Sequence, residues 1–401
     1  MTFRVRLALA LPLVAIAIAV GFAAGCGAAA KPIVLAPLPA GAPPLKLGVV
    51  ADTLDDRGSA RPKDERRVRA LGVRWVREEL RWADVEPRRG VFRWGQFDRL
   101  LSDSALHGLH VLPLLIGTPR WAGASYYAMP DPQAFGAFAA RAAARYGPGG
   151  GFWRARPRLA GYAPQWFELW NEPYTARYSA GGVDPVRYAQ MVRATLQQGR
   201  AVNPRARWLM AADLVYNDNA GRGHDWLAAI AAVDPTLEAD VDGVAVHPYA
   251  FVAPTDHGND TQLRYRFDRT AAIERELIQH GKANPVLWIT ELGWSTCSLR
   301  PDCTTERDQA QRLADVAAAL RRAPLIGHVQ ALFVYHLRDF PGARGSDREG
   351  HYGLLRTNGS RKPAWSVVRA LTLQRPAGLP KLPARAGRTT PAPRGSSRSA
   401  R

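Results

Sequence analysis

Two glutamates stand where a pair of carboxyl groups could carry out acid–base and nucleophilic chemistry together. Glu172 follows the apolar run Trp166–Trp170, and Glu291 follows the apolar run Val286–Thr290. Cleavage of a glycosidic bond needs one protonated carboxyl group that donates to the leaving oxygen, and one ionised carboxylate that attacks or stabilises the anomeric centre. Either glutamate alone is also compatible with a salt bridge at a strand end, so the hypothesis depends on the pair.

The elements that must position these glutamates alternate regularly along the chain. Apolar runs of strand length are separated by longer amphipathic segments such as 185–202 and 306–322. The eight runs are Leu45–Ala51, Trp75–Glu79, Val111–Ile116, Trp166–Trp170, Trp208–Ala212, Val241–Val246, Val286–Thr290 and Val329–Tyr335. This alternation predicts an α/β fold over residues 45–374, a TIM (β/α)8 barrel that forms a single catalytic domain.

A polar residue able to take part in chemistry ends nearly every predicted strand. These residues are Asp52, Arg77 or Glu79, Thr118, Asn171 with Glu172, Asp213, His247, Glu291 and His336. Barrel enzymes build their active sites at the carboxyl ends of the strands. We therefore expect these side chains to meet at one face of the barrel.

Several segments resemble clan A glycoside hydrolases, the cellulase and β-xylosidase superfamily. Asn171–Pro173 would end the fourth strand, Thr290–Gly293 the seventh and His247–Tyr249 the sixth, and Tyr352–Leu355 and Gly359–Trp365 agree as well. The resemblance covers nearly the whole barrel, and the closest likeness is to glycoside hydrolase family 39 and its relatives. It implies the barrel fold and a retaining mechanism.

The resemblance also implies a role for each matching residue. Glu172 would act first as general acid and then as general base, and Glu291 would attack the anomeric carbon. Asn171 would hydrogen-bond the sugar 2-hydroxyl. Tyr249 would donate to the carboxylate of Glu291, and His247 would line the same subsite or serve as a structural histidine.

Other expected substrate contacts depend on strand register or loop conformation. Arg77 would match the arginine that supports the nucleophile, although Arg74 and Arg81 lie close enough in sequence to replace it. Trp121 and Trp294 are placed to stack on sugar faces or to pack in loops. Glu168 is four residues before Glu172, so strand alternation would place both side chains on the same face, and we expect Glu168 to lie deeper in the barrel.

The eighth strand departs from the commonest pattern of the clan, in which a tryptophan ends this strand. The chain instead has the segment Phe333–Asp339 there. His336 or Asp339 would then contact the substrate. The departure leaves the reaction type intact, but it leaves the identity of the sugar open.

These observations predict a retaining β-glycoside hydrolase that cleaves O-glycosidic bonds of an extracellular or cell-wall glycan by double displacement. Two alternatives stay open, namely a transglycosylase that uses the same site and a non-catalytic polysaccharide-binding barrel. The sequence indicates no metal site and no cofactor. We expect a monomer whose partner is a carbohydrate.

The N-terminal segment 1–26 has the three parts of a secretory signal peptide. Arg4 and Arg6 precede the apolar run Leu7–Phe22, and the small residues Ala23–Gly25 lead to Cys26. The run is shorter than the ~20 residues of a membrane span. Ala23–Cys26 resembles a lipoprotein cleavage box, so we expect an exported protein, either secreted or attached to the cell surface by a lipid on Cys26.

The segments outside the barrel carry much of the charge. Residues 27–44 form a Pro/Ala-rich tether, and residues 375–401 contain seven basic and no acidic residues, which predicts a disordered basic tail. The formal net charge of the chain is +19, but its basic residues are scattered and match no nucleic-acid-binding module. We therefore expect no nucleic-acid partner.

Three cysteines occur in the chain. If Cys26 carries lipid, Cys297 and Cys303 remain as a pair in an exported protein. Such a pair predicts a disulfide that closes a short loop, and the alternative is two reduced thiols.

Overall fold

The computed structural model describes residues 45–55, 60–249, 259–299, 303–320 and 328–374. It also gives the backbone of two short antiparallel strands, β1 (Ala17–Ile18) and β2 (Ile33–Val34). Apart from these two strands, the predicted signal peptide (1–26, with Cys26), the tether (27–44) and the basic tail (375–401) lie outside the described residues. They stay predictions from the sequence.

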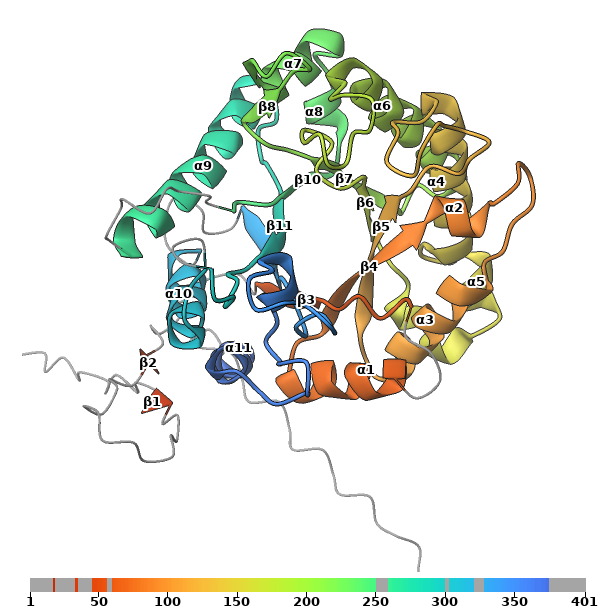
Figure 1. Cartoon of the computed structure of the whole chain (residues 1–401). Coiled ribbons are helices and arrows are strands. Elements are labelled where there is room, and N and C mark those ends of the chain that lie inside the picture. The colour runs from red at the N-terminus through yellow and green to blue at the C-terminus, as the bar shows by residue number, and fades with distance from the viewer. Residues whose placement is uncertain are drawn as a thin grey trace, which may run out of the picture.

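Eight parallel strands close into a barrel in the order β10-β11-β12-β3-β4-β5-β6-β7 (Figure 1). The strands are β3 (Lys46–Val50), β4 (Trp75–Arg81), β5 (His110–Ile116), β6 (Trp166–Leu169), β7 (Arg207–Ala211), β10 (Gly243–Val246), β11 (Leu287–Leu292) and β12 (Val329–Val334). Each of the eight predicted strands is one of these, and its ends agree to within a residue or two. The prediction of a single (β/α)8 barrel is confirmed.

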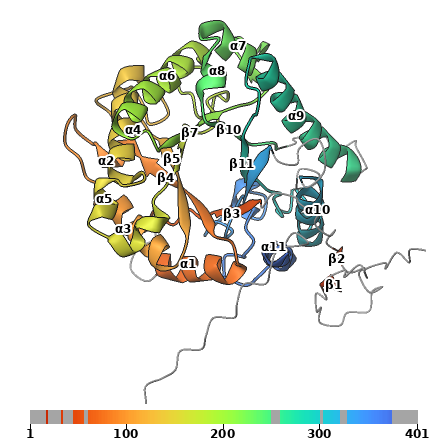
Figure 2. The ribbon, with the colours of Figure 1, turned by 180° about the vertical axis from the view of Figure 1, so that it is seen from behind.

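Helices surround the barrel on all sides, as the two opposite views show (Figures 1 and 2). The longer helices are α1 (Ala60–Leu71), α3 (Gly95–Leu106), α4 (Pro132–Tyr146), α6 (Pro185–Val202), α7 (Trp226–Val233), α9 (Asn259–Gln279), α10 (Glu306–Ala319) and α11 (Pro363–Leu373). Short elements fill the connections: α2 (Trp82–Val85), α5 (Gly151–Arg154), α8 (Leu237–Asp240), η1 (Pro157–Tyr162), η2 (Glu349–His351) and the hairpin β8 (Val215–Asn217) and β9 (Gly223–Asp225). Among the described residues, no helix is both long and apolar enough to cross a membrane.

The interior of the barrel is layered because strand side chains alternate between two faces. Three tryptophans form an apolar floor near the amino ends of the strands, with ring centroids 5.0 and 5.6 Å apart where they touch: Trp75, Trp166 and Trp288. Two residues further along the same strands lie three polar side chains: Arg77, Glu168 and Thr290. The strand period thus places a polar layer directly above a dry floor.

A disulfide joins Cys297 and Cys303, whose Cα atoms lie 5.4 Å apart, so this sequence prediction is confirmed. The bond closes the loop that follows β11. The same loop is held to the segment after β12, since the Ser298 amide donates to the Gly345 carbonyl at 2.7 Å. The chain after Glu291 is therefore anchored by both covalent and backbone bonds.

Helix α6 shows how local sequence signals set an element and its packing. Asp184 accepts a hydrogen bond from the Arg187 amide at 2.9 Å, and Pro185 occupies the first turn, so the helix begins where the sequence predicts. Near its other end, Gly199 lies against the indole of Trp208 on β7. A Cβ atom at position 199 would come within 2.3 Å of that ring.

We predict that Gly199→Ala destabilises the protein, although glycine-to-alanine changes inside helices usually stabilise. The clash with Trp208 should outweigh the helix-propensity gain of about 1 kcal/mol and leave a net loss of about 1–3 kcal/mol. Urea denaturation measures the change. Gly161→Ala is the matched control because a Cβ atom there meets nothing within 4 Å. Equal stability of the two variants would contradict this account of the α6–β7 contact.

Candidate active site

A cavity of about 950 Å³ opens at the carboxyl ends of the barrel strands. Among the residues that line it are six that the sequence predicted for the site: Arg77, Asn171, Glu172, His247, Tyr249 and Glu291. They come from the second, fourth, sixth and seventh barrel strands or from the residues just after them. The structure therefore brings the core of the predicted site together.

Glu172 lies on a sharp turn that follows β6. Trp170 and Glu172 both have positive φ, 67° and 40°, which is uncommon for residues with a side chain. The turn is held because the Trp170 indole donates to the Tyr178 carbonyl at 2.8 Å and the Thr175 amide donates to the Glu172 carbonyl at 2.9 Å. Such strain persists where the surroundings enforce it, and here it directs Glu172 into the cavity.

Glu291 lies in β11 at a break in the regular ladder. The pairing of β11 with β12 shifts between Ile289 and Leu292, and this shift allows the adjacent side chains of Thr290 and Glu291 both to face the barrel interior. In a regular strand they would face opposite sides. The irregularity explains how the nucleophile candidate and a supporting hydroxyl come from consecutive positions.

Arg77 and Tyr249 hold the carboxylate of Glu291. Arg77 donates from Nη1 to Oε1 at 2.6 Å, and the Tyr249 hydroxyl donates to Oε2 at 3.2 Å. The strand register selects Arg77 over Arg74 and Arg81, because Arg77 lies in the polar layer of the interior. The predicted contacts of both Arg77 and Tyr249 are present in the structure.

Glu168 lies beneath the cavity, deeper than Glu172, as the sequence predicted. Its side chain is 1% exposed and accepts from Arg77 Nε at 2.6 Å and from the Thr290 hydroxyl at 2.9 Å. Burial opposes ionisation, but the charge of Arg77 and hydrogen bonds from His247 and Arg77 outweigh it and lower the pKa of Glu168 to about 2. Glu168 is thus a buried anion that fixes Arg77.

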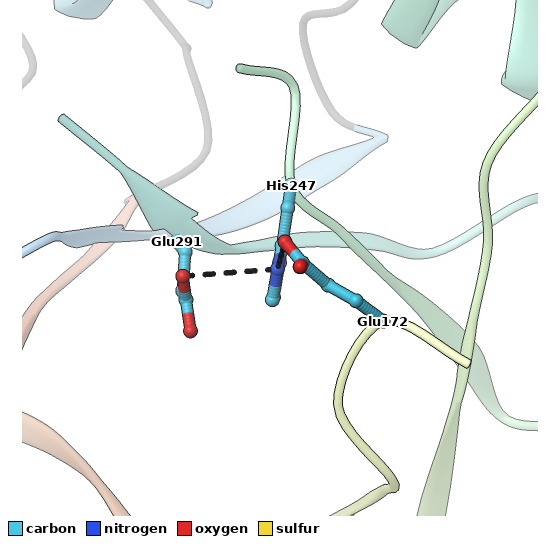
Figure 3. A group of neighbouring side chains, drawn as sticks. All are labelled: Glu172, His247 and Glu291. Carbon is cyan, nitrogen blue, oxygen red and sulfur yellow. Dashed lines mark hydrogen bonds and ion pairs between the residues drawn. The ribbon is translucent and has the colours of Figure 1, made fainter. Parts of the chain in front are cut away.

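His247 lies between the two catalytic candidates (Figure 3). Its Nδ1 is 2.9 Å from Oε1 of Glu172 and 3.8 Å from Oε2 of Glu291, and its Nε2 is 2.9 Å from the Thr290 hydroxyl. Burial disfavours the imidazolium, but the charge of Glu291 and contacts with Glu168 and Glu172 raise the pKa of His247 to about 10. His247 is therefore an imidazolium, protonated on both ring nitrogens, at neutral pH.

The two glutamates experience opposite shifts. Burial, together with the charges of Glu172 and Glu168, raises the pKa of Glu291, although His247 and Arg77 oppose this effect. For Glu172, burial is outweighed by the hydrogen bond and charge of His247, which lower its pKa.

Transfer of the proton from His247 Nδ1 to Glu172 across 2.9 Å would leave a neutral imidazole and a protonated Glu172. The total charge of the cluster would stay the same, so the site already contains the proton that a general acid needs.

A metal ion is a poor occupant of this cluster. One donor atom each from Glu172, His247 and Glu291 lie within 4.8 Å of one another, a spacing compatible with metal ligands. However, the Arg77 guanidinium already lies 2.6 Å from Glu291, and the imidazole Nδ1 is engaged by Glu172. A cation here would meet a fixed positive charge, so the arrangement fits acid–base chemistry better than metal coordination.

Three predicted substrate contacts do not line the cavity, namely those of Trp121, Trp294 and His336. The Trp121 indole donates to the Glu86 carbonyl at 2.8 Å, and Trp294 is buried with its carbonyl bound to Gln309. His336 is 2% exposed and stacks on Phe340 with centroids 4.5 Å apart. We therefore assign these three residues to loop packing. Asp339 is likewise engaged away from the cavity, in a buried ion pair with Lys362 at 2.7 Å.

The sequence interpretation missed most of the aromatic lining of the cavity, which consists of tyrosines. Besides Tyr249, these are Tyr174, Tyr178, Tyr216, Tyr335 and Tyr352. Tyr335 ends the eighth strand, immediately before His336, and its ring contacts Tyr249 and Tyr352 edge to face. Its position at a strand end was a usable signal. Tyr174 and Tyr178 follow Glu172 in a loop whose course the sequence did not define.

We predict that Glu168→Gln destabilises the fold by about 3–5 kcal/mol at neutral pH, because it removes one anion from a buried ion-pair network. Since folding lowers the pKa of Glu168, its stabilising effect is complete above pH ~4.5 and is lost as the pH falls toward 2. The stability difference between wild type and variant should shrink over that range in denaturation curves measured at several pH values.

Glu306→Gln is the control for this prediction, because the side chains of the Glu306–Arg356 ion pair keep 32% and 40% of their surface exposed, whereas Glu168 is fully buried. Its loss should change the stability by about 0–1 kcal/mol. A Glu168→Gln variant as stable as Glu306→Gln would show that the buried network contributes little to folding.

The sequence matches no protein-family model and no curated protein. Solved structures with a similar fold include a family 39 glycoside hydrolase from Bacteroides cellulosilyticus WH2, with 22% identity and a TM-score of 0.59. The match covers 82% of this chain and 64% of that one, so this chain spans less than two thirds of that protein.

Two further similar structures belong to other glycoside hydrolases. One is GH5_18 from Streptomyces cattleya in complex with GlcNAc, with 19% identity, a TM-score of 0.60 and coverage of 84% and 82% of the two chains. The other is a monomeric β-xylosidase from Caulobacter crescentus CB15, with 21% identity, a TM-score of 0.56 and coverage of 83% and 69%. At these identities the likeness concerns the fold. The fold that the resemblance to clan A glycoside hydrolases implied is confirmed, and a family 39 enzyme is among the similar structures.

Proposed function

We propose that the protein is a retaining β-glycoside hydrolase. The observation that carries the proposal is the pair Glu172 and Glu291: one carboxylate oxygen of each lies within 4.8 Å of the other, in a cavity at the carboxyl ends of the strands. Retaining enzymes hold their carboxyl groups ~5 Å apart, whereas inverting enzymes need a wider gap for a water molecule. The short separation favours direct attack by one carboxylate.

In the first step, Glu291 attacks the anomeric carbon and forms a glycosyl ester. The bond to the leaving oxygen breaks, and protonated Glu172 donates its proton to that oxygen. In the second step, ionised Glu172 takes a proton from water while the water oxygen attacks the anomeric carbon and releases Glu291. Two inversions restore the β configuration.

The supporting residues suit these roles. Arg77 and Tyr249 fix the orientation of Glu291, so little reorganisation is needed at the moment of attack. Asn171 accepts from Arg77 through Oδ1 at 2.7 Å, which leaves its amide nitrogen as the donor for the sugar 2-hydroxyl. His247 supplies the proton that Glu172 needs and re-forms its hydrogen bond after transfer.

We also propose that the enzyme acts outside the cell on a β-linked glycan. The support is the signal-peptide pattern of residues 1–26, the lipid-attachment pattern at Cys26 and the disulfide Cys297–Cys303, since such bonds persist in oxidising compartments. The similar structures include a β-xylosidase and a GH5_18 protein in complex with GlcNAc, which supports a carbohydrate substrate.

The test is hydrolysis of aryl β-glycosides (xyloside, glucoside, galactoside, mannoside and arabinoside) and of soluble β-glycans, with product anomers followed by NMR. We expect the β-anomer to form first. An α-product would contradict retention, and no turnover of any compound would contradict the hydrolase assignment. Transfer of the sugar to an added alcohol in preference to water would instead indicate a transglycosylase.

Two variants separate the roles of the carboxyl groups. Glu172→Gln should slow cleavage of substrates with poor leaving groups by about 10²–10⁴-fold, but it should spare the first step with activated aryl leaving groups, which need no proton. Glu291→Gln should abolish both steps with every substrate. Pre-steady-state release of the aryl group measures the first step. If Glu291→Gln retained that step, the nucleophile assignment would fail.

A further inference from the structure

Two carboxylates outside the catalytic pair line the cavity at the ends of the first two barrel strands. Val50 of β3 pairs with Arg77 of β4 in the parallel ladder. Glu79 comes two residues after Arg77 within β4, so strand alternation directs its side chain toward the cavity above Arg77. Asp52 comes two residues after Val50, just beyond the end of β3. Both residues are part of the cavity lining.

The protein holds Asp52 in place from behind the sheet. Asp52 has a φ of 50°, and the next residue, Thr53, is tied to the buried carboxylate of Glu78. The Thr53 hydroxyl donates to Glu78 at 2.7 Å and its amide at 3.1 Å, while Arg61 donates to the Thr53 carbonyl at 2.9 Å. These bonds account for an unfavourable backbone conformation that presents a carboxylate to the cavity.

Among the residues that the structure describes, Arg81 holds the Glu79 carboxylate. Arg81 donates to its Oε2 at 2.7 Å and also binds Asp55 at 2.7 Å. The Glu79 side chain keeps 31% of its surface exposed, so it has acceptor capacity left for a ligand in the cavity.

The charge of the cavity contrasts with that of the chain. The formal net charge is +19, yet the described residues that line the cavity include eight carboxyl groups, against four arginines and the protonated His247. Burial raises the pKa of Asp52 to about 7 and that of Glu78 to about 8, and even without these two the carboxyl groups outnumber the cations by six to five. Each of these arginines already lies within 4.0 Å of a carboxylate: Arg77, Arg177, Arg269 and Arg348. A carboxylate on the substrate would therefore meet an excess of negative charge.

Asp52 and Glu79 lie on the part of the cavity wall next to the sugar whose anomeric carbon is attacked. The barrel order β11-β12-β3-β4 places them on the same continuous wall as Glu291 and Tyr335, with Arg77 below. Asp213 and the β8–β9 hairpin lie on the part of the rim contributed by β7 and the residues after it. A sugar whose anomeric carbon faces Glu291 would rest against the Asp52 and Glu79 wall.

On the basis of the proposed function, we propose that Asp52 and Glu79 accept hydrogen bonds from hydroxyl groups of the reacting sugar, and that this sugar is neutral. Ionised carboxylates are strong acceptors for hydroxyl donors, and they repel the carboxylate of a uronic acid. The pair therefore selects neutral glycosides and rejects uronides. Burial, together with the charges of Glu79 and Glu291, raises the pKa of Asp52 to about 7, so the binding experiment is run above pH 7, where Asp52 is ionised.

The experiment measures binding by calorimetry, so that it does not depend on turnover. The probes are methyl β-xyloside, β-glucoside and β-mannoside as neutral sugars, methyl β-glucuronide as the anion and methyl β-glucosaminide as the cation. We expect at least one neutral probe to bind, with the glucuronide at least about tenfold weaker. Asp52→Asn and Glu79→Gln should each raise the Kd of the neutral probe about 10- to 100-fold.

Two controls distinguish ligand contact from structural damage. Asp84→Asn removes an exposed carboxylate on α2, just after β4 and outside the cavity, and should leave the Kd unchanged. Deoxy analogues of the neutral probe allow a double-mutant cycle between protein and ligand. The analogue that lacks the bound hydroxyl should bind wild type more weakly than the parent sugar does, whereas the variant without the matching carboxylate should bind both with the same Kd. Asparagine also tolerates the left-handed backbone at position 52, so that variant should fold.

The outcomes separate this inference from the proposed function. Binding of a neutral probe without turnover would support the subsite and overturn the hydrolase assignment. Turnover with preferred binding of the glucuronide or the glucosaminide would keep the hydrolase and overturn the subsite. Absence of binding by every probe, or full affinity in both variants, would also overturn the subsite.

Discussion

The site depends on one buried guanidinium. Arg77 uses Nε, Nη1 and Nη2 to bind Glu168, Glu291 and Asn171 at distances of 2.6 to 3.1 Å, and its side chain is 4% exposed. A planar guanidinium can bind three acceptors at once, here Glu168 and Asn171 from β6 and the residues just after it and Glu291 from β11, whereas a lysine would offer a single point charge. Removal of this cation would leave buried anions uncompensated, and the nucleophile would lose its orientation together with its counter-charge.

The fold and the catalytic pair could be predicted from the sequence because both depend on local patterns. The strands are short, nearly continuous apolar runs, and Glu172 and Glu291 follow two of them directly. Strand register also explains why Arg77, two residues above Trp75, faces the interior. Most of the expected contacts that do not line the cavity concern loops: Trp121 and Trp294 lie near strand ends in sequence but are not part of the lining. Loop side chains have no repeating period, so their direction follows from packing that one sequence does not reveal.

The electrostatics of the site also exceed what sequence could indicate. The sequence predicted a protonated acid, an ionised nucleophile and a nearby His247, but only the structure shows that His247 binds Glu172 and that the proton lies on the imidazole. A three-way contact among residues from the fourth, sixth and seventh strands is a property of the closed barrel. The sequence around each of the three residues does not indicate this contact.

The tyrosine lining has a consequence for spectroscopy. The chain contains twelve tryptophans, yet none is among the described residues that line the cavity, whereas six tyrosines are. Many of the tryptophans are buried in the barrel and between its helices, for example Trp82, Trp208 and Trp288. Tryptophan emission would therefore report the integrity of the barrel and change little when a sugar enters. Occupancy of the cavity would be read from the ultraviolet difference spectrum of its phenols.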